Sequence, residues 1–142
     1  MRLWHYYLLE YLDDFHIVSQ WRELLAIKGA IDKNGTPNHR LVNRVLDYDI
    51  THFQLYTTMV VEELKKRNIK YDKNKYKEIL NWNNSNFNQK KFNVLSTPTI
   101  FDGWHNNRYL KQCLYNLQEK YDCGIVSEDA WGKISEVFND IL

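Results

Sequence analysis

The stretch "DDFHIVSQWRELLAIKGA", residues 13–30, has the residue spacing of an amphipathic helix and indicates the fold class. Asp13 or Asp14 can cap the start of this helix, and Gly29 predicts its end near Lys28. One face is apolar and is expected to pack on the core. That face consists of Ile17, Val18, Trp21, Leu24 and Leu25.

The opposite face of the same helix is polar. His16, Gln20 and Glu23 share it, and Arg22 lies at the border of the apolar face. His16 and Glu23 are two turns apart, about 10 Å along the helix axis. A carboxylate beside an imidazole and a guanidinium can act as a general base or stabilise a developing cation. From the positions on a helical wheel alone, the simpler interpretation is that this polar face is exposed to water.

Further segments with helical spacing predict an all-α fold: a compact single domain with long irregular connecting loops. Turn residues predict a loop over 34–38. Thr51 and Gln54 match the capping-box pattern that opens a helix. The expected helices are one starting at Thr51, a short one over 75–82, one over 107–121 ended by Gly124, and one capped by Ser127.

The segment 83–105 has no sustained period, and a loop of this length is uncommon inside a compact domain. It contains Phe87, Phe92, Phe101 and Trp104, together with Lys90-Lys91. Two interpretations follow. The aromatic rings attach the segment to the core, or they stack on unpaired bases beside a basic step.

The composition fits one domain covering residues 1–142. Hydrophobic residues make up 44% of the chain, which is enough for a core. The net charge is only +1, so any basic surface must come from the arrangement of charges. No signal peptide or membrane-spanning stretch is visible, and Cys113 on an apolar face is expected to be a buried thiol. We therefore expect a cytoplasmic protein that does not contact membranes.

The remaining histidines do not indicate a metal centre. His5, His39, His52 and His105 lack ligand spacing, and no carboxylate or second cysteine falls at a recognised offset from them. We expect these histidines at the surface or in turns, and we expect neither a metal nor a cofactor.

The N-terminal segment "MRLWHYYLLEYLDDFHIVSQWRELLAIKGA" resembles the start of the pyrimidine-dimer DNA glycosylase family, the phage endonuclease V type. The resemblance is carried by an acidic helix start, then His16, then the run Trp21-Arg22-Glu23-Leu24, at matching distances from the N-terminus. It extends more weakly through "NHRLVNRVLDYD" and "LKKRNIKYD". The resemblance implies a small all-α enzyme that removes damaged bases through an imine with its N-terminal amine and then cleaves the strand by β-elimination.

The resemblance implies roles for individual residues. The family's essential glutamate falls on Glu23, the arginine that handles phosphate and the flipped-out partner base on Arg22, and its helix histidine on His16. The family's attacking threonine and following arginine have their counterpart in Met1-Arg2, one residue earlier. Methionine is normally retained before arginine, so we expect the Met1 amine to be the nucleophile.

The expected partner is double-stranded DNA with damaged or abasic sites, bound by a monomer. Phosphate contacts are expected from Arg2, Arg22, Arg40 and Arg44. Lys28 and Lys33 are further candidates. Where the family places another DNA-binding arginine this chain has Ala26, and the family's aromatic C-terminal tail has no counterpart. These differences affect the choice of lesion more than the imine chemistry.

Two alternatives to a glycosylase with abasic-site lyase activity stay open from the sequence. One is a non-catalytic DNA-binding relative. The other is a helical protein-interaction module in which Arg22 and Glu23 form an intramolecular salt bridge.

Overall fold

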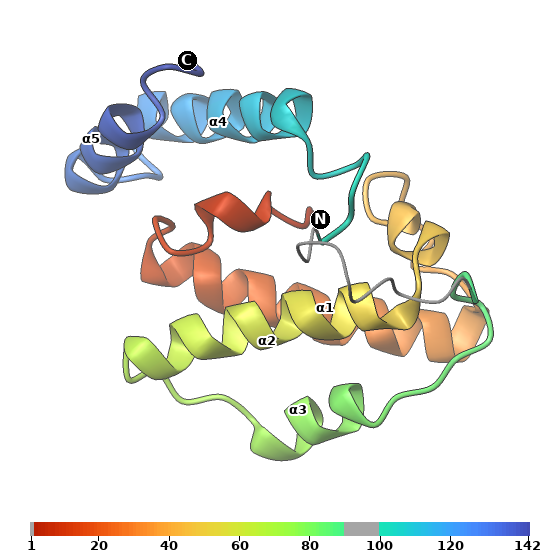
Figure 1. The fold of residues 1–142 in the computed structure, drawn as a ribbon. Helices are drawn as coiled ribbons and strands as arrows, with labels where there is room; N and C mark the ends of the chain where they lie inside the picture. Colours follow the sequence, from red (N-terminus) through yellow and green to blue (C-terminus); the bar gives the residue numbers. More distant parts are fainter. Residues whose placement is uncertain (1, 90–99) are drawn as a thin grey trace, which may run out of the picture.

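The computed structural model describes residues 2–89 and 100–142, and over these ranges it contains helices and no strand (Figure 1). This confirms the predicted all-α class. No helix within the described ranges has both the length and the apolar character needed to cross a membrane. The elements are the 3-10 helix η1 (Tyr6–Leu8), α1 (Asp14–Asn34), the 3-10 helix η2 (Asn43–Asp47), α2 (Ile50–Lys66), α3 (Lys73–Leu80), α4 (Asn107–Asp122) and α5 (Glu128–Val137).

Helix α1 starts where the sequence predicts but ends later. Asp13 caps its start. Gly29 does not end the helix, because the buried side chains of Ile27 and Ile31 continue the core-facing stripe past it. Their burial outweighs the cost of one interior glycine, about 1 kcal/mol. The helix ends instead at Gly35, whose φ of 79° is left-handed and whose N–H donates to the Ile31 carbonyl at 2.8 Å.

The start of α2 differs from the predicted capping box. Asp49 caps this helix by accepting the backbone N–H of Thr51 at 2.9 Å. The Gln54 side chain points away from the helix start and satisfies carbonyls at the end of α3, which begins two residues earlier than predicted. Those carbonyls belong to Ile79, Leu80 and Trp82. The buried face of α2 includes Phe53, Tyr56, Val60 and Leu64.

The two C-terminal helices match their predictions. Helix α4 ends at Asp122, and Gly124 follows with a φ of 80°. The side chain of Ser127 caps α5 by accepting the Ala130 N–H at 3.1 Å. Cys113 is fully buried on the apolar face of α4, as expected.

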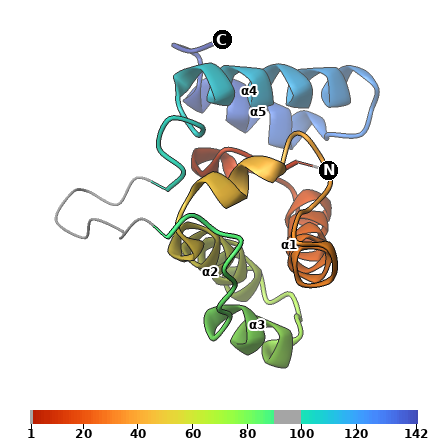
Figure 2. The same ribbon diagram turned by 90° about the vertical axis from the view of Figure 1, so that its right-hand side faces the viewer.

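The first residues of the chain form a middle layer between the helices. In Figures 1 and 2 this segment (red) runs between α4 and α5 on one side and α1 and α2 on the other. Most of its residues are buried, while Tyr7 and Glu10 are exposed. The side chains that it places in the core are those of Leu3, Trp4, His5, Leu8 and Leu9. The N-terminus is therefore built into the core rather than laid on its surface.

The aromatic residues of the long connection before α4 attach it to the core. Phe87, Phe101 and Trp104 are almost completely buried. This supports the first interpretation of that segment. Phe92 and Lys90-Lys91 lie outside the described residues.

The prediction of surface or turn positions is wrong for three of the four remaining histidines. His5, His52 and His105 are buried. Each is retained in the core because a ring nitrogen meets a backbone group: His5 Nε2 lies 3.0 Å from the His105 carbonyl, and His52 Nδ1 accepts the Phe101 N–H at 3.0 Å. Nδ1 of His105 accepts the Tyr6 N–H at 3.3 Å. Pairing with the backbone reduces the cost of burying each ring, while Nε2 of His105 has no hydrogen-bond partner among the described residues.

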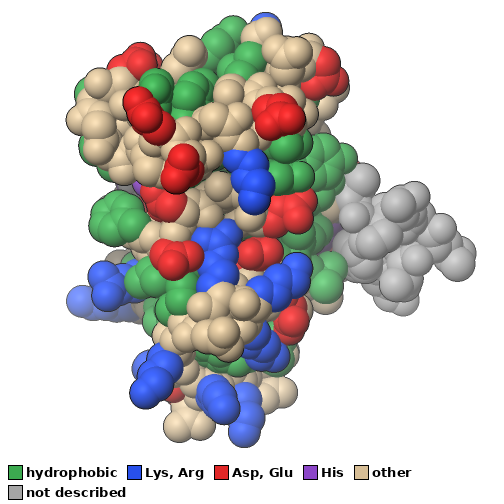
Figure 3. Space-filling model, turned by 90° about the vertical axis from the view of Figure 1, so that its left-hand side faces the viewer, with side chains coloured by type: hydrophobic (Ala, Val, Ile, Leu, Met, Phe, Trp, Pro, Cys, Tyr) green, Lys and Arg blue, Asp and Glu red, His purple; other side chains and the backbone are tan. Residues whose placement is uncertain are grey.

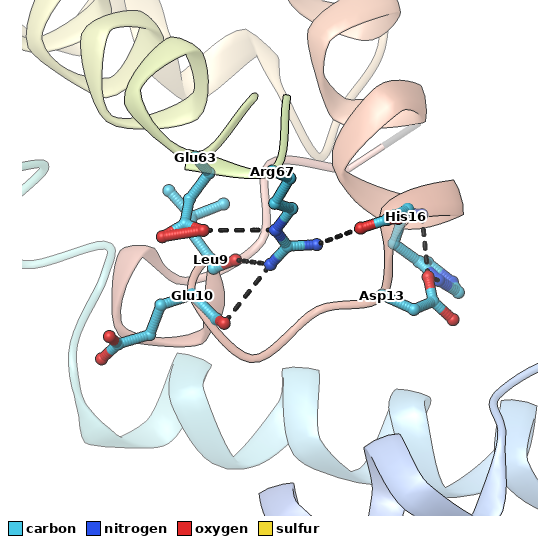
Figure 4. Close-up of polar contacts among 7 residues, drawn as sticks. Leu9, Glu10, Asp13, His16, Glu63 and Arg67 are labelled. Atoms are coloured by element: carbon cyan, nitrogen blue, oxygen red, sulfur yellow. Dashed lines mark hydrogen bonds and ion pairs between the residues drawn. The ribbon is translucent and has the colours of Figure 1, made fainter. Parts of the chain in front are cut away.

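Arg67 joins the end of α2 to the turn that precedes α1 (Figure 4). Its guanidinium donates to the Glu63 carboxylate at 3.3 Å and to the Asp14 carboxylate at 3.1 Å. It also donates to the backbone carbonyls of Leu9 and Glu10, each at 3.3 Å. This one side chain fixes where the N-terminal segment turns into α1.

Charges are separated on the surface although the net charge is close to zero. Figure 3 looks onto the side of the molecule at the left of Figure 1, and there Lys and Arg side chains gather in the lower half while acidic side chains gather in the upper half. The lower half is formed by α3 and the end of α2, which contain Lys65, Lys66, Lys73 and Lys75. Arrangement therefore creates basic surface that the total charge does not reveal.

Candidate active site

The site is centred on a hydrogen bond between Arg2 and Glu23. The backbone N–H of Arg2 donates to Oε2 of Glu23 at 3.0 Å. Both residues line a cavity of about 360 Å³ between α1, α4 and the loop after α1. The other residues that line this cavity, called the Glu23 cavity below, are Trp4, Phe15, His16, Ser19, Gln20, Leu41, Asn116 and Lys120.

The predicted solvated face of α1 is not solvated. Gln20 is only 1% exposed, because residues 2–5 cover that face. Its amide oxygen accepts the Trp4 N–H at 2.8 Å, and its amide nitrogen donates to the Arg2 carbonyl at 2.9 Å and lies 3.3 Å from Glu23 Oε2. One backbone donor and one backbone acceptor therefore assign the oxygen and the nitrogen of the Gln20 amide. Gln20 therefore holds both the N-terminal backbone and the Glu23 carboxylate.

Two buried tyrosines hold the same backbone from the other side. The Tyr109 hydroxyl of α4 donates to the Leu3 carbonyl at 2.6 Å. The Tyr56 hydroxyl of α2 lies 2.6 Å from the Trp4 carbonyl and 2.9 Å from Gln20 Oε1. Burial raises the pKa of both phenols, so they stay neutral donors. Three helices thus fix the backbone that leads to the N-terminus.

His16 is held in one orientation by Asp13 (Figure 4). Its Nδ1 lies 2.6 Å from Asp13 Oδ1, and the same oxygen accepts the His16 backbone N–H at 2.9 Å. A carboxylate only accepts, so the Nδ1 proton lies between the two groups. The other ring nitrogen, Nε2, is buried and has no hydrogen-bond partner among the described residues. His16 lines the Glu23 cavity, while its Nε2 is shielded from solvent.

Helix α4 supplies a wall of the cavity that the sequence did not predict. Asn116 and Lys120 are four residues apart on α4 and line the cavity opposite α1. Arg108 and Gln112 continue the same row toward the start of the helix. A polar row at i, i+4, i+8 and i+12 was visible in the sequence, but it was indistinguishable from an ordinary solvated face.

A second polar cavity, of about 390 Å³, lies beside the start of α4. Arg44, Arg108 and Gln112 line it. The Arg44 guanidinium is held 5.6 Å above the Trp104 ring and donates to the Gly103 carbonyl at 3.4 Å. Among the described residues no acidic side chain lines this cavity, so its lining is suited to an anion.

The structure brings together only some of the predicted site residues. Arg2, His16 and Glu23 meet at the Glu23 cavity, and Arg44 lies at the second cavity. Arg22 is exposed on α1 next to Glu23, and within the described ranges it forms no ion pair with it. The nucleophile candidate, Met1, lies outside the described residues.

The other predicted cations lie away from both cavities. Lys28 is bound to Asp32 at 2.8 Å and lies 5.2 Å from the centre of the Trp82 ring. Lys33 and Arg40 are exposed and line neither cavity. Within the described ranges no group of three or more His, Cys, Asp and Glu side chains could hold a metal ion.

Comparison with known proteins identifies the family. The model of a family described as pyrimidine dimer DNA glycosylase matches residues 1–77, more than half of the 142-residue chain. The chain belongs to the pyrimidine dimer DNA glycosylase family. No curated protein and no solved structure matches the chain significantly.

Family membership implies a DNA glycosylase whose substrate is DNA. The matched segment holds α1, with His16 and Glu23, and all of α2. It ends before α4, so the wall formed by Asn116 and Lys120 lies outside the segment that the family model describes.

Proposed function

We propose that this pyrimidine dimer DNA glycosylase removes a damaged base and then cleaves the strand at the resulting abasic site, through an imine with the Met1 amine. The observation that carries the proposal is the 3.0 Å hydrogen bond from the Arg2 N–H to Glu23. Met1 immediately precedes Arg2 in the sequence, and this adjacency supports the Met1 amine as the nucleophile.

The terminal amine suits imine formation better than a lysine does. An α-amino group has a pKa of about 7.7–8.0, against about 10.4 for lysine, so a much larger fraction is neutral near neutral pH. The neutral nitrogen attacks C1′ of the damaged nucleotide, and the base leaves with the bonding electron pair. The nitrogen then loses a proton and the C1′–O4′ bond opens to give the imine. Loss of a proton from C2′ expels the phosphate from C3′, and water hydrolyses the imine to return the amine.

Glu23 has two tasks in this proposal. Its carboxylate stabilises the positive charge that develops on the sugar as the base leaves, and it accepts and returns protons during ring opening and elimination. Gln20 and the Arg2 N–H hold it in place before the substrate arrives, so little reorganisation is needed. The Asp13-bound ring of His16 lines the same cavity and supports its wall.

Phosphate groups are bound by cations around the cavity. Arg2 and Lys120 line the Glu23 cavity, and exposed Arg22 lies beside it on α1. Arg44 and Arg108 would bind the backbone at the second cavity, farther along the duplex. We further propose that the enzyme acts as a monomer in the cytoplasm, where Cys113 and Cys123 are free thiols.

Borohydride trapping tests the proposal. Reduction of the imine should give a covalent complex with abasic DNA, and peptide mapping should place the adduct on Met1. Acetylation of the N-terminus removes the amine and leaves every side chain, so trapping and strand cleavage should vanish while DNA binding persists. An adduct on a lysine would move the active site, and no adduct together with no cleavage would overturn the proposal.

A further inference from the structure

A further cavity lies between α2, the end of α5 and the N-terminal segment. Its volume is about 570 Å³, which is within the range of about 300–1,000 Å³ typical of sites for small ligands. It shares no lining residue with the Glu23 cavity or with the cavity at Arg44. The proposed base removal and strand cleavage therefore leave this cavity without a role.

Aromatic rings form much of the wall of this cavity, called the aromatic cavity below. The rings of Tyr6 and Tyr7 meet edge to face, with centroids 4.7 Å apart. Those of Tyr11 and Phe138 do the same at 5.5 Å. The face of an aromatic ring attracts a cation. Among the described residues no lysine or arginine lies over any of these four rings, so the wall is suited to a cation from outside the chain.

Three carboxylates line the same cavity, those of Glu10, Glu62 and Glu63. Glu10 forms no ion pair among the described residues, and in Figure 4 its carboxylate points away from Arg67. Glu62 pairs with Lys65 at 3.3 Å, and both side chains are about half exposed, so a ligand replaces this pair at little cost. Glu63 is already paired with Arg67. The aromatic cavity thus offers two carboxylates to a ligand.

The lining favours a ligand whose positive charges are separated along a chain. Within the described ranges no group of three or more His, Cys, Asp and Glu side chains could hold a metal ion, so these carboxylates do not converge on one point. The lining residues of α2 extend from Thr58 to Lys66, about 12 Å along the helix axis. The apolar side chains of Leu9, Met59 and Val137 also line the cavity. An elongated apolar chain with ammonium groups fits this combination.

We infer that the aromatic cavity binds a linear aliphatic polyamine. Its ammonium groups pair with Glu10 and Glu62 and lie against the faces of the tyrosine rings. Its methylene groups cover apolar surface that now faces water, since Tyr7 is 51% and Val137 is 45% exposed. This binding site goes beyond the glycosylase activity and depends on neither DNA nor the imine.

Calorimetric titration of the protein with spermidine tests this inference. DNA is left out, because its phosphates attract the same cations. Spermidine should saturate one site per chain. At one fixed ionic strength it should bind about tenfold more tightly than magnesium, which has no methylene groups, and than tetramethylammonium, whose single charge reaches one carboxylate.

Variants of the cavity separate the two kinds of contact. Glu10→Gln removes one charge and should weaken spermidine binding about fivefold. Tyr7→Leu removes a π-face but keeps an apolar side chain, and it should weaken binding about threefold, whereas Tyr7→Phe should retain the parental affinity. Both residues are exposed, so the melting temperature should not change.

Matched controls lie elsewhere on the surface. Glu128 on α5 and Tyr115 on α4 are exposed and do not line the aromatic cavity. Glu128→Gln and Tyr115→Leu should therefore bind spermidine as tightly as the parent.

Several results would overturn the inference. Binding that does not saturate, or an equal affinity for magnesium or tetramethylammonium, would show that spermidine is only a counterion or that a linear chain is not recognised. Equal losses for Glu10→Gln and Glu128→Gln, or parental affinity in both Glu10→Gln and Tyr7→Leu, would place the bound cation elsewhere. The titration contains no DNA, so failure of borohydride trapping overturns the lyase proposal alone and leaves the polyamine site standing.

Discussion

Glu23 is hydrogen-bonded to the backbone of Arg2, twenty-one residues earlier in the chain, and not to the side chain of its neighbour Arg22. The carboxylate therefore belongs to the N-terminal segment as much as to its own helix. This relationship excludes, for the described residues, the arrangement in which Arg22 and Glu23 neutralise each other. It also makes Glu23 the residue whose substitution most directly separates chemistry from folding.

Glu23→Gln should abolish strand cleavage at abasic sites and keep both the fold and DNA binding. The amide oxygen of glutamine can still accept the Arg2 N–H, and the side chain keeps its volume, so the free energy of unfolding should change by no more than about 1 kcal/mol. The measurement is the rate of nicking with enzyme in excess, beside a binding assay. Glu128→Gln, on an exposed residue, is the matched control. Nicking at the parental rate would show that Glu23 has no catalytic role.

Gln20→Met should destabilise the protein more than Tyr56→Phe does. Methionine has a similar size but leaves the Trp4 N–H and the Arg2 carbonyl without partners, at about 1–3 kcal/mol for each buried group. Removal of the Tyr56 hydroxyl leaves one buried group, the Trp4 carbonyl, without that partner, while Gln20 Oε1 stays bonded to the Trp4 N–H, so its cost should be about 1–3 kcal/mol in total. Urea unfolding measures both values. The reverse order would mean that Gln20 does not hold the N-terminal backbone.

Arg67→Met should cost about 2–4 kcal/mol of stability, because Glu63 and two backbone carbonyls lose their partner in a largely buried place. Lys66 also pairs with Glu63, at 3.6 Å, but its side chain is 70% exposed. Lys66→Met should therefore cost no more than about 1 kcal/mol. Thermal unfolding of the two variants side by side gives the comparison. Similar losses would contradict the role assigned to Arg67.

Stability should fall as the pH drops below the ordinary histidine value. Burial lowers the pKa of His5 to about 4 and that of His105 to about 2, with the charge of His5 as a second cause for His105. Below about pH 6.5 the unfolded chain binds protons at these histidines while the folded protein keeps both rings neutral. Their contribution to the free energy of unfolding is therefore fully present above about pH 6.5 and decreases as the pH falls toward 4. Urea midpoints measured across this range report the loss. His5→Gln should flatten the profile, and an unchanged slope would show that other groups cause it.

DNA affinity should decrease with salt, with a log–log slope of about 0.9 for each phosphate neutralised. Lys120→Met and Arg108→Met should each reduce that slope by about one, because each removes one cation at a cavity. Lys66→Met, away from both cavities, should leave it unchanged. Affinity that does not vary with salt would contradict an electrostatic interface.

The sequence predicted the fold class because helical spacing is a local signal. The caps Asp13 and Ser127, and the apolar face that holds Cys113, are set by neighbours within a few residues, and they were found. The end of α1 was misplaced because a glycine was weighed without the packing of Ile27 and Ile31. The start of α2 was misplaced because Gln54 bonds to α3, about 25 residues away.

The site was predictable only where its residues share one helix. His16 and Glu23 fall on one face of α1, and the family resemblance gave them roles. The burial of Gln20 was not predictable, because residues 2–5 cover it, and a helical wheel does not show what lies above a face. The Asn116 and Lys120 wall depends on packing across about 100 residues of chain. The buried histidines were missed for the same reason: their partners are backbone groups far away in sequence.

The N-terminal segment, layered between two pairs of helices, has a consequence for biosynthesis. Arg2 contacts Cys113, the Leu3 carbonyl accepts a hydrogen bond from Tyr109, and His5 is hydrogen-bonded to the backbone of His105. Each contact spans about 100 residues. The ribosome synthesises the N-terminal segment long before the residues that it contacts. Contacts this distant in sequence form late and slow the search for the native state. Because Asn116 and Lys120 of α4 form part of the wall of the Glu23 cavity, the cavity can be completed only after α4 has been synthesised.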